Sequence, residues 1–69
     1  MEFVFHGRNA AWFNALKGDR AEMIDWVKRT LVEAEAHRDL EQLMLEYFRT
    51  AADFDKYRGA PEFAALLNR

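Results

Sequence analysis

The sequence predicts an all-α protein: a small helical bundle of three long and short helices plus a short C-terminal helix, with an extended N-terminal arm. Three observations predict this class. The chain has 69 residues, enough for one domain. Apolar residues recur at helical spacing from residue 10 onward, and no glycine or proline interrupts an expected helix. Ten aromatic residues offer a dense core to a chain that has no cysteine for disulfides.

The N-terminal segment "MEFVFHG" alternates in its side chains, so we expect residues 1–8 to form an extended arm. Met1, Phe3 and Phe5 would share the face that packs onto the helices, and a frayed helical turn is the alternative. A short helix over 10–17 follows, with Asn9 as its N-cap. Its apolar residues are Trp12, Phe13 and Leu16.

A second helix is expected over 20–37. Gly18 ends the first helix, Asp19 caps the second, and Glu22 stands at the capping-box spacing. Its apolar positions recur every three or four residues: Met23, Ile24, Val27, Leu31 and Ala34. Residues 9–37 would therefore form the first helical hairpin.

A third helix is expected over 39–58, with Asp39 as its cap. Its apolar stripe consists of Leu40, Leu43, Met44, Tyr47, Ala51 and Phe54. Gly59 would end it in left-handed geometry. Pro61 then opens a short capping helix over 61–68, whose apolar face carries Phe63, Leu66 and Leu67. The whole chain, 1–69, would be one helical domain.

The stretch "FDKYRGAPEFAALL" resembles the C-terminal end of bacterial tetratricopeptide-repeat proteins, in which an Asp-x-x-Phe-Asp-x-x-Arg-x-x-Pro-x-Phe-x-x-Leu-Leu pattern is common. The matching residues are Phe54, Asp55, Arg58, Pro61, Phe63, Leu66 and Leu67. "ALKGDRAEMIDWV" resembles one repeat hairpin with its turn at Gly18-Asp19, although Met23 and Asn14 replace the family's alanine and aromatic residue. The resemblance implies a protein-binding scaffold with no catalytic residues.

Composition and residue types exclude several functions. A formal net charge of −2 with interleaved charges disfavours nucleic-acid binding. Two distant histidines, His6 and His37, cannot complete a metal site, and the absence of serine and cysteine removes the commonest nucleophiles. We expect Thr30 and Thr50 to bond to the preceding helical turn. The sequence thus predicts no enzyme, no cofactor and no metal, in a cytoplasmic protein.

Large apolar residues outside the expected stripes are the candidate partner-binding residues: Trp26, Leu45 and Phe48, together with Trp12. Either the arm and the outer helices cover them, or they form an exposed patch for a partner. The second reading predicts a small non-catalytic protein–protein interaction module or regulator of bacterial or phage type. The alternatives are a homodimerising helical bundle with a structural role and a helix-turn-helix-like nucleic-acid binder.

Overall fold

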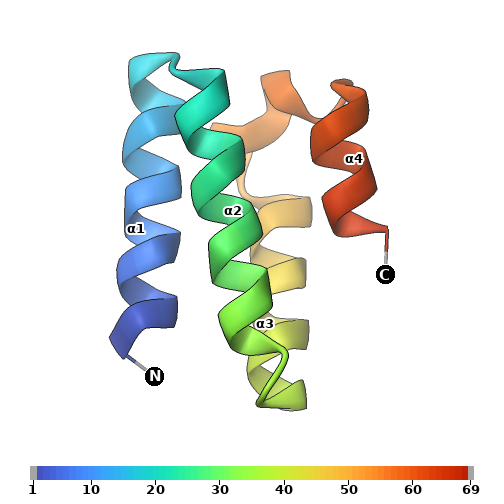
Figure 1. Ribbon diagram of the computed structural model, residues 1–69. Coiled ribbons are helices and arrows are strands. Elements are labelled where there is room, and N and C mark those ends of the chain that lie inside the picture. Colours follow the sequence, from blue (N-terminus) through green and yellow to red (C-terminus); the bar gives the residue numbers. More distant parts are fainter. Residues whose placement is uncertain (1, 69) are drawn as a thin grey trace.

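The computed structural model describes residues 2–68, with side chains from Val4 to Asn68, and every element in that range is a helix. Helix α1 spans Glu2–Lys17, α2 spans Arg20–Ala34, α3 spans Arg38–Thr50, the 3-10 helix η1 spans Ala52–Tyr57, and α4 spans Pro61–Leu67. The all-α bundle is therefore confirmed. Helices α1 and α4 lie on opposite sides of the pair formed by α2 and α3 (Figure 1). The expected domain ends, Met1 and Arg69, lie outside the described residues.

The extended arm is wrong, because α1 is continuous from Glu2. As a strand, this segment would have no partner for its backbone groups, whereas a helix pairs those groups internally. The helix also places Val4, Gly7 and Ala11 together on the side that packs against α2, and all three are buried. Asn9 is accordingly a mid-helix residue and not an N-cap. The expected arm face cannot be followed at Met1 or at the Phe3 side chain, which lie outside the described side chains.

Small residues let α1 and α2 approach closely. Gly7, Ala11 and Ala15 recur every four residues on the inner side of α1, and each is buried. A Cβ atom added at Gly7 would lie 2.3 Å from Oγ1 of Thr30 on α2. The Thr30 hydroxyl donates to the carbonyl of Trp26 at 2.7 Å, which confirms the expected bond to the preceding turn. Glycine is therefore required at position 7 by the crossing of two helices.

The turn between α1 and α2 follows the sequence prediction. Gly18 has φ = 83°, the left-handed geometry that glycine adopts at little cost. The Asp19 carboxylate accepts the backbone N–H of Glu22 at 3.2 Å and so caps α2. Helix α2 ends at Ala34 and not at His37, and His37 precedes α3 in extended geometry, so Asp39 lies in the first turn of α3.

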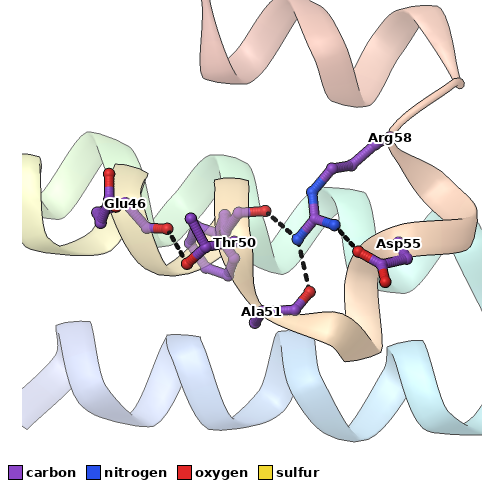
Figure 2. A network of polar contacts seen from close by, with 6 residues as sticks. Glu46, Thr50, Ala51, Asp55 and Arg58 are labelled. Carbon is purple, nitrogen blue, oxygen red and sulfur yellow. Dashed lines mark hydrogen bonds and ion pairs between the residues drawn. The ribbon is translucent and has the colours of Figure 1, made fainter.

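The third helix ends at Thr50, so a single helix over 39–58 is wrong. Ala51 is extended, with φ = −63° and ψ = 128°, and η1 follows in a new direction. Arg58 stabilises the break (Figure 2): its guanidinium donates to the carbonyls of Phe48 and Ala51 and pairs with the Asp55 carboxylate. A cation at a helix C-terminus satisfies carbonyls that have no partner within the helix.

The core is built from aromatic rings that η1 and α4 bring onto α3. Phe48 and Phe54 meet edge to face with ring centroids 5.3 Å apart, and Phe54 stacks on Phe63 at 5.9 Å. All three rings are fully buried. Pro61 occupies the first turn of α4, as expected. Gly59 does not have a positive φ, so its expected left-handed role is wrong; within the described residues Gly18 is the glycine with that geometry.

Candidate interaction surface

Helix α1 is apolar on both of its sides. Its inner side packs against α2 and η1, while its outer side carries four large apolar residues that solvent reaches. Phe5 and Trp12 are each 39% exposed, Leu16 is 53% exposed and Phe13 is 55% exposed. We call these four residues, with the exposed Asn9 among them, the outer α1 face. A helix that is apolar all round is usually covered on all sides, so this face is the strongest candidate for a binding surface.

Trp12 is fixed in place by the 3-10 helix. Its indole Nε1 donates to Oδ2 of Asp53 at 2.8 Å. The neighbouring Tyr57 hydroxyl donates to the Ala15 carbonyl at 3.0 Å, which ties η1 to the last turn of α1. These two bonds join residues about forty positions apart, so the folded chain holds the indole before any partner arrives. Such preorganisation reduces the entropy that is lost on binding.

Cations border the outer α1 face on two sides. The Arg8 guanidinium lies 5.3 Å from the ring centroid of Phe5 and 5.4 Å from that of Tyr47, and the Lys17 ammonium lies 5.5 Å from the ring centroid of Phe13. Burial raises the pKa of the Tyr47 phenol above its ordinary value, while Arg8 acts to lower it. The surface therefore has an apolar centre and a polar rim, which is the arrangement of known protein interfaces.

Two of the candidate partner-binding residues belong to the core. Leu45 is 1% exposed and Phe48 is fully buried, so neither can contact a partner. Leu43, which was expected in the core stripe, is 55% exposed instead. The buried side of α3 keeps Leu40 and Met44 of the expected stripe but is rotated toward Leu45 and Phe48, because α3 packs against η1 and α4 as well as against α2. Outer elements thus cover Leu45 and Phe48, which was the alternative that the sequence left open.

Trp26 and Trp12 remain partly accessible. Trp26 is half-buried on α2, where the His6 ring meets it edge to face with centroids 5.7 Å apart and the Arg29 guanidinium lies 5.1 Å from its ring. Its neighbours already occupy much of its surface. Trp12 is the one residue of the four candidates that lies on the outer α1 face.

Sequence reasoning missed Phe5 as a surface residue because residues 1–8 were expected to be extended. It missed Phe13 and Leu16 because they were assigned to the apolar side of a short helix over 10–17. A usable signal was present. Phe5, Asn9, Trp12 and Leu16 follow one another at intervals of four, three and four residues, which places them on one side of a helix that starts near the N-terminus. A surface helix usually buries its large apolar residues. Helix α1 does the reverse, because its large apolar residues lie on the outer side and its small residues lie on the inner side.

The rest of the described surface offers little chemistry. An open groove of about 360 Å³ on α2 is lined by Asp25, Lys28, Arg29, Val32 and Glu33. Asp25 and Arg29 pair across one turn at 3.0 Å, so part of its charge is already neutralised. Within residues 2–68, no three His, Asp or Glu side chains gather closely enough to hold a metal ion. In the same range, no helix combines the length and the apolar character needed to cross a membrane.

Compared with known proteins, the chain matches no protein-family model, no curated protein and no solved structure at a significant level.

Proposed function

We propose that this chain is a small non-catalytic protein–protein interaction module that binds its partner through the outer α1 face. The observation that carries the proposal is the exposure of Phe5, Trp12, Phe13 and Leu16 on one side of one helix. Large aromatic residues that are held rigidly contribute much of the binding energy in protein interfaces. The cytoplasm is the expected compartment, since a chain without cysteine depends on no oxidising environment.

Two further observations support a binding role. The Asp53–Trp12 hydrogen bond fixes the indole, the largest side chain of the face, in one orientation, which reduces the entropy lost when a partner binds it. The resemblance of residues 54–67 to the end of tetratricopeptide-repeat proteins points in the same direction, because those repeats are protein-binding scaffolds. The resemblance supports the proposal by analogy between this chain and those helical scaffolds.

Position-specific photo-cross-linking in living cells tests the proposal. Phe13 or Leu43 is replaced by p-benzoylphenylalanine; both side chains are 55% exposed, on α1 and α3 respectively, so the two variants are matched controls for one another. We expect discrete covalent protein adducts from position 13 and background from position 43. Equal adducts at the two positions, or adducts at position 43 alone, would refute the outer α1 face as the binding surface.

A further inference from the structure

The outer α1 face has the spacing of a coiled-coil seam. Phe5, Asn9, Trp12 and Leu16 are separated by four, three and four residues, the 3.5-residue spacing of a coiled-coil seam, with apolar residues at three of the four positions. In heptad terms, Phe5 and Trp12 occupy d positions, and Asn9 and Leu16 occupy a positions. Phe13 flanks the seam at an e position. Such a seam is completed by a second helix whose axis crosses the first at a small angle. The side chains of the second helix then pack between those of the first.

We propose that the occupant of this face is a second copy of the chain, paired α1 to α1 in a parallel, in-register homodimer. This inference rests on the proposed function and names its partner. Helix α1 lies at the edge of the bundle opposite α4 (Figure 1), and the apolar side chains of its outer side reach solvent, so a second α1 can approach that side. A two-fold axis along the seam then sets Phe5, Trp12 and Leu16 opposite their own counterparts.

Asn9 favours a second copy over an unrelated helix. It is exposed in the middle of an apolar seam, where its contact within the chain is the bond that its Oδ1 accepts from Arg8 at 3.3 Å. A partner that covers the seam must offer its amide a polar group at the same level. A second copy supplies one by symmetry, because Asn9 meets Asn9. One asparagine at an a position is a known device for fixing register and the number of strands.

The same residue selects the parallel orientation. In an antiparallel pair, Asn9 would face Trp12 of the other copy. The Trp12 indole N–H already donates to Asp53 at 2.8 Å, so it has no hydrogen to offer there. The Asn9 amide would then be buried against an aromatic ring with no partner, which an in-register parallel pair avoids.

The apolar area fits a dimer of modest size. With roughly 200 Å² for each fully exposed large side chain, the exposed fractions of the four apolar residues amount to about 370 Å² in one chain and about 740 Å² in two. A stable interface buries about 1,200–2,000 Å² in total, of which a little over half is apolar. The seam therefore supplies the apolar share of an interface near the lower end of that range, and the net charge of −2 per chain opposes association only weakly.

Sedimentation of the purified chain over a concentration series tests the dimer. We expect the mass to rise from that of one chain, 8.2 kDa, to twice that value, with a dissociation constant in the micromolar range. Leu16→Glu, at a half-exposed site that the fold tolerates, should weaken association at least about 100-fold. Leu43→Glu, equally exposed on α3, should leave the dissociation constant within about threefold of the starting value.

Cross-linking tests the register in a chain that has no cysteine of its own. Leu16→Cys, which keeps Asn9 in place, should form a disulfide-linked dimer under mild oxidation, because in-register a positions bring the two Cα atoms within disulfide reach. Leu43→Cys should remain a monomer in denaturing gels. A dimer that forms without the Leu16→Cys cross-link would overturn the parallel register.

The outcomes separate this inference from the proposed function. A monomeric mass at every concentration up to the high-micromolar range overturns the homodimer. A dimer that Leu16→Glu leaves intact overturns pairing through the outer α1 face. If position 13 nevertheless cross-links to other proteins in cells, the proposed function stands with a different partner. If position 13 gives no adduct at all, both statements fall.

Discussion

Replacing Gly7 by alanine tests the close crossing of α1 and α2. A Cβ atom at this position would lie 2.3 Å from Thr30 Oγ1, well inside van der Waals contact, and 3.7 Å from the Thr30 Cα. The hydroxyl cannot move freely, because it donates to the Trp26 carbonyl and because a β-branched side chain has few rotamers. Either the helices separate or Thr30 abandons its hydrogen bond.

Opposing terms set the size of the effect. Alanine in place of a mid-helix glycine favours the helix by about 1 kcal/mol. Overpacking a tight contact costs about 1–3 kcal/mol, and losing the Thr30 hydrogen bond costs about 1 kcal/mol more. We therefore expect Gly7→Ala to lower the free energy of unfolding by about 1–3 kcal/mol. In a domain of this size that corresponds to a fall in Tm of about 4–24 °C.

Thermal and urea unfolding in two backgrounds give the decisive comparison. Thr30→Ala removes the clashing oxygen and leaves contacts of ordinary length. In that background Gly7→Ala should no longer be destabilising, and the gain in helix propensity should make it stabilising by up to about 1 kcal/mol. Gly59→Ala is the matched control: no atom lies within 4 Å of the added Cβ and φ is not positive, so it should change stability by less than about 1 kcal/mol. If Gly7→Ala raises the Tm in both backgrounds, helix propensity outweighs packing and the reasoning fails.

Two other predictions concern the break after α3 and its neighbour Tyr47. Arg58→Ala should lower the free energy of unfolding, measured in urea, by about 2–3 kcal/mol, because it removes charged donors to the carbonyls of Phe48 and Ala51. Asp55→Asn should lower it by less than about 1 kcal/mol, since the Asp55 carboxylate is mostly exposed. If both variants lowered the free energy of unfolding equally, the stabilisation by Arg58 would come from its ion pair with Asp55 and not from its bonds to the carbonyls. Burial holds the pKa of the Tyr47 phenol above its usual 10.0, so this phenol ionises at a lower pH in the unfolded chain than in the folded one. The stability that the neutral phenol contributes is therefore complete below about pH 10 and is lost as the pH rises further. Tyr47→Phe should make stability between about pH 9 and about pH 11 fall less steeply, and an unchanged slope would contradict this assignment.

The elements that were predicted correctly are those with local chemistry. Gly18 is left-handed and Asp19 caps α2, because a short-range geometric need selects these residue types. Pro61 opens α4 for the same reason. Gly59 has the same local appearance as Gly18, yet its φ is not positive, since η1 and not a long helix precedes it. A local signal is reliable only when the preceding element has been identified correctly.

The errors arose where distant contacts decide the conformation. The N-terminal alternation was overridden because Gly7 fits the surface of α2 at Thr30, a contact that no local pattern shows. The continuous stripe from Leu40 to Phe54 gave no sign of the break at Ala51, which Arg58 stabilises from seven residues away. That break brings η1 beside α1, and the position of Trp12 depends on it.

The sequence by itself determined the all-α class, the capped turn between α1 and α2, and the start of the last helix, because each follows from periodicity and from residues with strong local preferences. Only the tertiary structure decided which large apolar residues reach solvent. Leu45 and Phe48 are buried because η1 and α4 fold over α3, and Phe13 and Leu16 are exposed because the small residues of α1 face α2. Exposure is a property of neighbours that are distant in the chain, so it emerges only when the helices have packed.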